Sequence, residues 1–391
     1  MNYLIFVLVL CSSHLFAKSE TRLVYLTWKN DPTTTMTVQW LTSNKKPIDT
    51  LQYCPNDDTS KWQIASGTHT EVPQGHSYIL HRVQLKNLTP DTTYQFKLGK
   101  SNTLYRFKTM PKDLSKPIRF VVGGDIYQHS VSKFEKMNKV AAKKNPRFAI
   151  LGGDIAYTAP SKKKKSSEDF SKWRSFFKIW MRTMKDNNGC LIPILATIGN
   201  HEVRGDFNSS PKDAPFYYAF FERTSYDIQM GKYAYFVFLD SDHTLPIKGR
   251  QTDWLKKALK NHKKVTHRFA TYHVGAYPST GKTDGRVRRH VREHWVPLFE
   301  KYKVQACFES HDHAYKRTHS LINGKPHANG VVYFGDGSWG VTPRTPKKHS
   351  YIAHAKASQQ VLVVELSSHH QRFQAIDPNG KTIDRYEQKI K

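Results

Sequence analysis

The chain has 391 residues, 38% hydrophobic and 13% aromatic, a composition that fits a packed globular protein of one or two domains and excludes a disordered chain. Lys and Arg number 61 against 32 Asp and Glu, so the formal net charge is +29. Such a surface should attract polyanions, including phosphorylated substrates and anionic envelope surfaces. The charge is spread along the chain except at Lys162–Lys165, and no nucleic-acid fold signature accompanies it, so we predict no specific nucleic-acid partner.

Residues 1–17 predict a signal peptide. The apolar run from Tyr3 to Cys11 has the length of a signal h-region and is too short to span a bilayer, and Ala17 is a plausible cleavage point. A buried first strand is the alternative interpretation. No other stretch approaches the roughly 18 apolar residues that a membrane span needs. We therefore expect a secreted or periplasmic protein without a membrane span.

Cysteine usage is light. Once the signal is removed, Cys54, Cys190 and Cys307 remain, an odd number that rules out a disulfide scaffold. Cys190 and Cys307 are the pair to test first for a disulfide. Because Cys307 lies in the apolar run VQACFE, a buried and inert thiol is the better expectation for it.

Residues 18–112 read as an N-terminal β-sandwich. Met36, Val38 and Trp40 alternate with polar residues, which is the period-two pattern of a half-buried strand. Farther on, the turn at Leu88-Thr89-Pro90 followed by Tyr94 resembles the tyrosine corner of fibronectin-type-III and other immunoglobulin-like sandwiches.

The pattern changes in residues 113–391, where short apolar runs alternate with helical stretches. Strands alternating with helices predict an α/β layered domain, so the whole chain is expected to be a β-sandwich followed by an α/β catalytic domain. One helix is expected around Phe134 to Ala141, and another at Trp254 to Leu259 with Thr252 and Asp253 as possible caps. The apolar runs lie at 119–123, 147–151, 193–199, 234–239, 268–272, 304–308 and 331–334.

Polar residues stand directly after five of these runs. Because the carboxyl ends of strands gather at one edge of an α/β sheet, we expect these side chains to meet there. The residues are Asp125, Asp154, Tyr157, Asn200, His201, His273, His311 and His313.

The residue types indicate metal binding. Asp, Tyr and Asn supply hard oxygen ligands, and three of the histidines supply borderline nitrogen ligands, a combination that suits iron, zinc or manganese. The set is larger than one ion with open positions requires and matches two metals that share a carboxylate. Each residue alone has a plainer interpretation, such as a helix cap for an Asp or a chance His-x-His in a chain with 20 histidines. The ordered combination GGDxxY, GNHE, strand-end His and HDH is what favours the metal site.

This combination resembles the purple acid phosphatases, a family of calcineurin-like metallophosphoesterases. The family pattern is D-x-G, GD-x-x-Y, GNH-D/E, a strand-end His and GH-x-H, and it is matched here between about residues 119 and 340. A similar N-terminal sandwich precedes the catalytic domain in plant and many bacterial members.

The resemblance implies a dinuclear centre and a role for each residue. Asp125, Tyr157 and His313 would bind a ferric ion, and a divalent Fe(II), Zn(II) or Mn(II) would be held by Asn200, His273 and His311. Asp154 would bridge the two ions, and His201 would face the substrate instead of binding metal.

Two positions depart from the family pattern. Tyr127 stands where the family usually has the glycine of D-x-G, so a bulky ring could reshape the pocket mouth, and Ser310 replaces the glycine of GH-x-H. His290 and His294 lie where substrate-binding histidines could be expected, but a solvated helix face explains them equally well.

The resulting hypothesis is an acid phosphatase. It would hydrolyse phosphate monoesters by attack of a metal-activated hydroxide at an Fe(III)–M(II) site, with His201 as general acid for the leaving alkoxide. A metal-dependent phosphodiesterase is one alternative. The other is a non-catalytic envelope protein that binds polyanions through its sandwich and basic surface.

Overall fold

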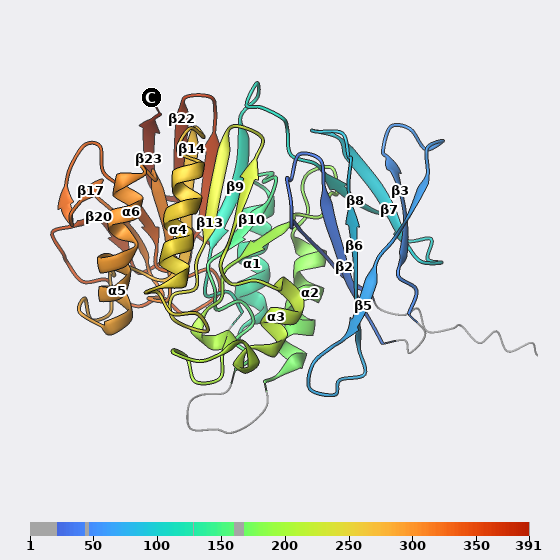
Figure 1. Ribbon diagram of the computed structural model, residues 1–391, viewed down its shortest axis with the longest axis horizontal. Helices are drawn as coiled ribbons and strands as arrows, with labels where there is room; N and C mark the ends of the chain where they lie inside the picture. The colour runs from blue at the N-terminus through green and yellow to red at the C-terminus, as the bar shows by residue number, and fades with distance from the viewer. Residues whose placement is uncertain (1–21, 44–46, 128, 160–167, 391) are drawn as a thin grey trace, which may run out of the picture.

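A computed structural model describes residues 22–43, 47–127, 129–159 and 168–390 (Figure 1). The predicted signal peptide and Lys162–Lys165 lie outside the described residues. Within the described residues, no helix is long and apolar enough to cross a membrane.

The N-terminal part is a sandwich of two four-stranded antiparallel sheets, as predicted. A tyrosine corner is present, because the backbone N–H of Thr89 donates to Tyr94 Oη at 2.9 Å. One sheet has the order β1 (Leu23–Thr27), β2 (Met36–Thr42), β6 (Ile79–Leu85) and β5 (Thr68–Glu71), and the other has β4 (Gln63–Ser66), β3 (Thr50–Pro55), β7 (Thr93–Leu98) and β8 (Tyr105–Lys108).

The expectation of a half-buried strand at residues 36–40 is wrong, because β2 is buried on both faces. Its inner face packs in the sandwich core, while the outer face of its sheet packs against helices of the C-terminal part. On that outer face Tyr25 stacks on Phe177 with ring centroids 4.2 Å apart. Alternation along one strand cannot reveal a second packing partner contributed by a distant segment.

The same outer face caps helix α3 (Pro215–Phe221). The last carbonyls of a helix lack partners within the helix. Tyr25 Oη donates to the carbonyl of Phe220 at 3.1 Å, and Arg82 donates to the carbonyl of Ala219 at 2.9 Å. The sandwich therefore holds the end of α3 through its main chain.

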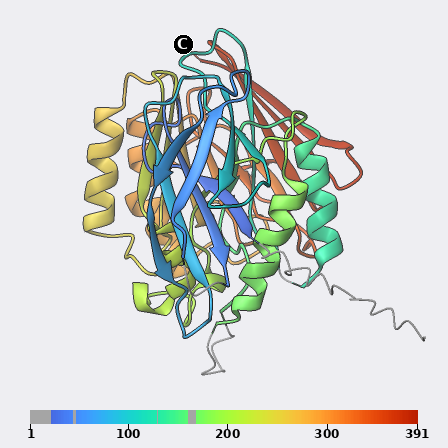
Figure 2. The same cartoon turned by 90° about the vertical axis from the view of Figure 1, so that its right-hand side faces the viewer.

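The C-terminal part has two central sheets with helices outside each, which confirms the α/β layered fold (Figures 1 and 2). Helices α1 (Val131–Ala142) and α2 (Phe170–Thr183) cover one sheet, and α4 (Arg250–Asn261), α5 (Arg286–His294) and α6 (Val296–Lys301) cover the other.

The strand order of the first sheet is β11 (Ile194–Ala196), β10 (Ala149–Leu151), β9 (Ile118–Gly123), β21 (Val361–Leu366), β22 (His370–Ile376) and β23 (Thr382–Lys389). That of the second is β12 (Tyr226–Met230), β13 (Ala234–Phe238), β14 (His267–Val274), β15 (Ala306–Ser310), β19 (Val332–Gly335), β16 (Tyr315–Thr318) and β20 (Ile352–Lys356). A small hairpin, β17 (Leu321–Ile322) and β18 (Lys325–Pro326), completes the strands, and short 3₁₀ turns lie at η1 (Asn200–Glu202) and η2 (Pro211–Asp213).

An aromatic core joins the two central sheets. Phe120 of β9 lies edge-on to Phe236, Phe269 and Phe308 of the facing sheet, at centroid distances of 5.5, 5.9 and 6.2 Å. Aromatic pairs in this geometry stabilise beyond the area they bury. The two sheets are thereby held face to face, with the carboxyl ends of their parallel strands on the same side.

The helix ends follow ordinary capping chemistry with one correction. Ser130 caps α1 by accepting the N–H of Lys133, and Asp169 caps α2 by accepting the N–H of Ser171. Thr252 and Asp253 do not cap α4, because the helix already begins at Arg250 after Gly249. The hydroxyl of Thr252 instead donates to the carbonyl of Ile247 at 2.6 Å.

The described cysteines Cys54, Cys190 and Cys307 are buried free thiols, so Cys190 and Cys307 do not form a disulfide. Burial raises the pKa of the Cys190 thiol to about 12 and that of the Cys307 thiol well above its usual range. Both thiols are therefore protonated and inert, as expected for Cys307.

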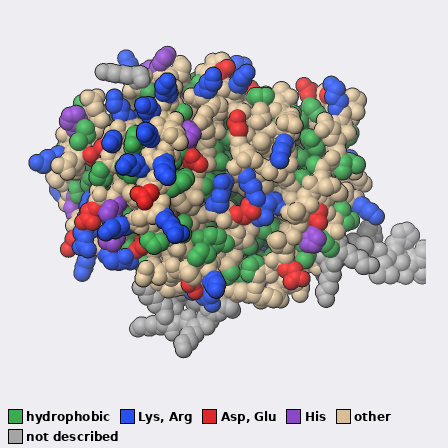
Figure 3. Space-filling view, viewed as in Figure 1, with side chains coloured by type: hydrophobic (Ala, Val, Ile, Leu, Met, Phe, Trp, Pro, Cys, Tyr) green, Lys and Arg blue, Asp and Glu red, His purple; other side chains and the backbone are tan. Residues whose placement is uncertain are grey.

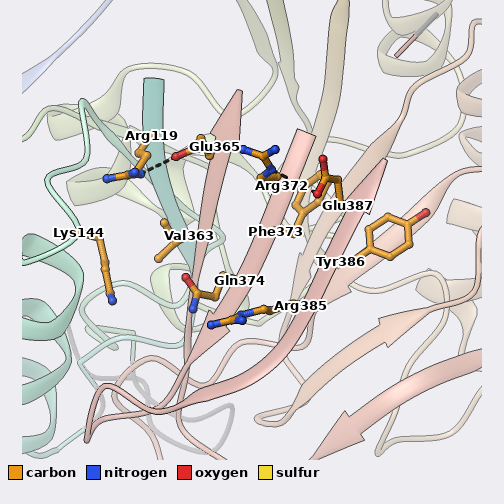
Figure 4. A pocket seen from close by; sticks show the side chains of 10 residues that line it. All are labelled: Arg119, Lys144, Val363, Glu365, Arg372, Phe373, Gln374, Arg385, Tyr386 and Glu387. Atoms are coloured by element: carbon orange, nitrogen blue, oxygen red, sulfur yellow. Dashed lines mark hydrogen bonds and ion pairs between the residues drawn. The ribbon is translucent and has the colours of Figure 1, made fainter. Parts of the chain in front are cut away.

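A groove of about 590 Å³ crosses β9, β21, β22 and β23 (Figure 4). Four of its charged side chains form a row: Glu365 accepts from Arg119 at 2.8 Å and from Arg372 at 3.2 Å, and Arg372 also lies 3.3 Å from Glu387. The groove is lined by none of the predicted site residues.

Candidate metal centre

All eight predicted site residues come together, but from two sheets instead of one edge. Asp125 follows β9, Asp154 and Tyr157 follow β10, and Asn200 and His201 follow β11, all in the first sheet. His273 lies near the end of β14, and His311 and His313 follow β15 in the second sheet. The strands concerned run parallel within each sheet, so their carboxyl ends open on the same side.

The first group of converging atoms is formed by Asp125, Tyr157 and His313. Asp125 Oδ1 lies 3.1 Å from Tyr157 Oη and 2.9 Å from His313 Nε2. Tyr157 Oη lies 3.3 Å from His313 Nε2. A carboxylate oxygen, a phenol oxygen and an imidazole nitrogen therefore face one another.

The second group is formed by Asn200, His273 and His311. Asn200 Oδ1 lies 3.1 Å from His273 Nε2 and 2.9 Å from His311 Nδ1. The two nitrogens lie 3.3 Å apart. The grouping matches the division of residues that the resemblance implies.

Asp154 connects the second group to His201. Its Oδ2 lies 3.3 Å from His273 Nε2 and 3.9 Å from His201 Nε2, and its Oδ1 accepts the backbone N–H of His201 at 2.8 Å. Asp154 is 1% exposed, whereas the His201 side chain is 39% exposed. Of the two, His201 is the residue that can reach a molecule arriving from solvent.

The backbone at this site is unusual. Five of the predicted ligands adopt a left-handed conformation that non-glycine residues rarely take, and such strained residues gather at functional sites. Their φ angles are 55° at Asp125, 51° at Asp154, 53° at Tyr157, 79° at His311 and 56° at His313.

Two glycines allow the chain to pass close to the carboxylates. A Cβ atom at Gly199 would overlap Asp154 Oδ1, and one at Gly337, where φ is 63°, would overlap Asp125 Oδ2. Any side chain at either position would displace a carboxylate of the cluster.

The electrostatics of the cluster favour cations. Burial, together with the charges of Asp125 and Asp154, raises the pKa of the Tyr157 phenol well above its usual range. Burial opposes the charge on His273, but Asp154 outweighs it and raises the pKa of His273 to about 9. Burial, reinforced by the His273 charge, lowers the pKa of His311 to about 4. At His273 and Tyr157 the buried carboxylates therefore favour positive charge and disfavour further negative charge.

The residues fit a pair of metal ions. His273 Nδ1 lies 2.8 Å from the carbonyl of Gly152, so Nδ1 keeps its proton, and Nε2, which faces the cluster, is the nitrogen whose proton a metal would displace. The low pKa of His311, in contrast, already favours the neutral imidazole that a metal requires. In each group three potential ligand atoms lie within 3.3 Å of one another, close enough for one cation to bind all three.

Two residues that were not predicted support the cluster. Glu202 Oε1 accepts the backbone N–H of Ile155 at 2.7 Å and its Oε2 accepts that of Gly199 at 3.1 Å, which ties the Asp154–Tyr157 segment to the Asn200 turn. Lys172 of α2 donates to the carbonyl of Tyr157 at 2.7 Å. Glu202 could have been found from the GNHE motif, whereas no sequence signal links Lys172 to Tyr157.

The departures from the family pattern are accommodated locally. The ring of Tyr127 packs against Phe134 of α1, with centroids 5.7 Å apart. Ser310 is buried, and its hydroxyl lies so close to Gly124 and Gly152 that a Cβ atom on either would overlap it. His290 and His294 are partly exposed on α5, which fits a solvated helix face.

Comparison with known proteins identifies the family. Residues 22–109 match the family model "Purple acid Phosphatase, N-terminal domain", and residues 118–315 match "Calcineurin-like phosphoesterase". Purple acid phosphatase 13 of Arabidopsis thaliana is 24% identical over 319 residues, covering 68% of this chain and 55% of the relative. The Fe(3+)-Zn(2+) purple acid phosphatase 12 of the same plant is 23% identical, covering 77% and 65%. The chain thus spans little more than half to two thirds of these relatives.

Among solved structures, a purple acid phosphatase from yellow lupin (Lupinus luteus) seeds superimposes with a TM-score of 0.77 at 14% identity. The match covers 94% of this chain and 74% of the lupin chain. The β-sandwich and the α/β layers together therefore have the same fold as the lupin protein. The chain belongs to the purple acid phosphatase family of calcineurin-like phosphoesterases.

Proposed function

We propose that the protein is an acid phosphatase that hydrolyses phosphate monoesters at a two-metal centre. The observation that carries this proposal is the pair of donor groups, Asp125–Tyr157–His313 and Asn200–His273–His311, with Asp154 beside them. A protein that only binds anions has no need for two sets of inward-facing ligands. Two ions held there would lower the pKa of water and neutralise charge on a phosphoryl group.

The first ion is proposed to be Fe(III), because a phenolate is a hard ligand suited to a ferric ion. The raised pKa of Tyr157 means that the phenol ionises only when a strong cation displaces its proton. The second ion is proposed to be Fe(II), Zn(II) or Mn(II), held by one oxygen and two nitrogen ligands. An Arabidopsis relative is named as an Fe(3+)-Zn(2+) enzyme, which supports this pairing.

The residues of the chain have separate tasks in the reaction. Asp154 accepts the His201 backbone N–H and thereby sets the position of the His201 ring. That ring is partly exposed beside the cluster, where a protonated imidazole can donate to the leaving oxygen of the ester. Lys172 and Glu202 hold the backbone of the Tyr157 and Asn200 segments, which keeps both ligand groups in register.

The basic surface is proposed to draw anionic substrates and anionic surfaces to the protein. Lys248, Arg250, Lys256, Lys257 and Lys260 are all exposed on or beside α4. Basic side chains gather over this helix and α5 in the left half of Figure 3. Such a field raises the local concentration of anions and is screened by salt. The predicted export of the protein would expose this face to anionic envelope surfaces.

A phosphodiesterase is the second candidate function, since two-metal sites also cleave diesters. One preparation tests both. Metal analysis and a visible spectrum of the purified protein should give two metals per chain, at least one of them iron, and a broad purple absorption. Nitrophenyl phosphate should be hydrolysed faster than bis-nitrophenyl phosphate at acidic pH.

The opposite rate order would favour the diesterase. Two zinc or manganese ions in a colourless active protein would exclude the ferric site and keep the hydrolase. Absence of both metal and esterase activity would favour the polyanion-binding alternative.

A further inference from the structure

In the segment His311-Asp312-His313, the two histidine side chains lie in the two donor groups and the aspartate between them belongs to neither group. His311 Nδ1 lies in the second donor group, 2.9 Å from Asn200 Oδ1. His313 Nε2 lies in the first group, 2.9 Å from Asp125 Oδ1. The residue between them, Asp312, is bound instead by Arg288 of α5.

The contact between Arg288 and Asp312 is a two-pronged buried ion pair. Arg288 Nη2 donates to Asp312 Oδ1 at 2.6 Å, and Nη1 donates to Asp312 Oδ2 at 3.0 Å. Asp312 is 1% exposed and Arg288 is 7% exposed. A planar guanidinium bound at both nitrogens fixes the orientation of the carboxylate as well as its distance, which a lysine ammonium could not do.

Arg288 also reaches the strand end that carries the third histidine. Its Nη1 donates to the carbonyl of Gly275 at 3.2 Å, two residues beyond His273. The hydroxyl of Thr280, from the segment that follows, donates to the carbonyl of Asp312 at 2.9 Å. Gly281 lies against the pair, since a Cβ atom there would be 2.9 Å from Arg288 Nη2. The pair is therefore covered by protein and joins the segments that bear His273, His311 and His313.

The backbone of this segment needs such a restraint. His311 and His313 both adopt left-handed φ angles, 79° and 56°, which an unrestrained chain would leave. Asp312, at the centre, is the one residue of the three that does not contribute to a donor group. A buried carboxylate released from its partner would draw the segment toward water.

We propose that Arg288 is a positioning residue that sets the spacing of His311 and His313, and so keeps both metal sites competent at once. This inference rests on the proposed two-metal centre. Its distinguishing consequence is that loss of Arg288 lowers the affinity for both metals, although Arg288 contacts neither donor group. If the ion pair served only overall stability, its loss would lower the melting temperature and leave the metal affinities unchanged.

The test compares Arg288→Gln, Arg288→Lys and Asp312→Asn with Arg289→Gln as the matched control. Arg289 is the next residue of α5, has a 54% exposed side chain and lies 3.8 Å from the exposed Glu293. Each purified protein is checked for folding by circular dichroism, and the affinity for Fe(III) and for Zn(II) is then measured by competition with a chelator. The melting temperature of the metal-free form is measured separately.

We expect Arg289→Gln to bind both metals like the wild type. Arg288→Gln and Asp312→Asn should each lose about 10- to 100-fold in affinity for both metals, the usual effect of removing an outer-shell support. Arg288→Lys should recover part of this loss. If Arg288→Gln cannot be folded, Arg288→Lys and Asp312→Asn still carry the comparison.

Two results would overturn the proposal. One is a folded Arg288→Gln protein with a lower melting temperature but metal affinities within twofold of the wild type. The other is a loss confined to a single metal, since a spacing role must affect both. A wild-type protein that binds neither metal would instead refute the proposed function, and this inference with it.

Discussion

The imidazole ring of His201 stacks on the phenol ring of Tyr157, with centroids 4.5 Å apart and planes inclined by 25°. The proposed proton donor thus rests on a proposed metal ligand. The two residues come from different strand ends, and the backbone N–H of His201 is bound by Asp154. The position of the proton donor is therefore set by the same residues that would hold the ions.

Replacing His201 with Ala should separate good from poor leaving groups. We expect turnover of an alkyl phosphate to fall by about 10²- to 10⁴-fold, the usual contribution of general acid catalysis. Hydrolysis of nitrophenyl phosphate should fall far less, because nitrophenolate leaves without a proton. Steady-state rates with both esters provide the measurement, and His290→Ala on α5 is the control. Equal slowing of both esters would exclude the proton-donor role.

Replacing Tyr157 with Phe should abolish the purple absorption without unfolding the protein. The substitution keeps the ring under His201 and removes only the oxygen of the first donor group. Iron content should fall while the group formed by Asn200, His273 and His311 still binds a divalent ion. Visible spectra and metal analysis check this outcome, with Tyr127→Phe as the control. A Tyr157→Phe protein that kept the colour of the wild type would refute the phenolate assignment.

Replacing Glu168 with Gln should change how stability depends on pH. Glu168 is 3% exposed, and burial raises its pKa from 4.5 to about 8. A carboxyl group with a raised folded-state pKa contributes stability that is fully present below about pH 4.5 and is lost as the pH rises through about 8. The contribution corresponds to about 5 kcal/mol.

Denaturant unfolding between pH 4 and pH 8.5 would measure the Glu168 effect. The wild type should lose stability toward pH 8, and the curve of Glu168→Gln should be flatter. Glu293→Gln, at an exposed position of α5, should follow the wild type. Parallel curves for wild type and Glu168→Gln would show that Glu168 does not carry this dependence.

Reversing two charges on α4 should weaken binding to anionic surfaces. Lys256 and Lys260 are exposed and stand four residues apart on the helix, a like-charge spacing that disfavours an isolated helix by about 0.2–0.5 kcal/mol. Lys256→Glu with Lys260→Glu should reduce binding to anionic lipid vesicles and reduce its salt dependence. The control carries Lys86→Glu and Lys100→Glu, which reverse two exposed charges on the sandwich. Equal loss in both double variants would mean that net charge matters and the α4 face does not.

The residues that meet at the site were predictable because each lies next to a short apolar run. Asp154 and Tyr157 follow one strand closely, and Asn200 and His201 follow another, so local order along the chain was enough. The division of the strand ends between two sheets was not predictable. No local sequence pattern in β14 or β15 indicates that these strands pair with each other and not with β9.

Supporting contacts were hidden for a related reason. Arg288 lies 24 positions from Asp312, and Glu202 lies 47 positions from Ile155, so only the folded chain joins them. The alternation at Met36 to Trp40 located a strand but not its second packing partner. Patterns along one strand report its period, whereas what covers each face depends on segments far away in sequence.

The sandwich contacts α3 through carbonyl oxygens of the helix, and this affects which sequence changes this chain can tolerate. Tyr25 and Arg82 bind the main chain of Phe220 and Ala219, which is chemically the same whichever side chain those positions carry. Substitutions along α3 can therefore accumulate without removing these contacts. Insertion or deletion of a residue before Ala219 would rotate the carbonyls away by about 100°, since a helix turns once in 3.6 residues. Variants of this chain should therefore tolerate substitutions in this helix more readily than a change in its length.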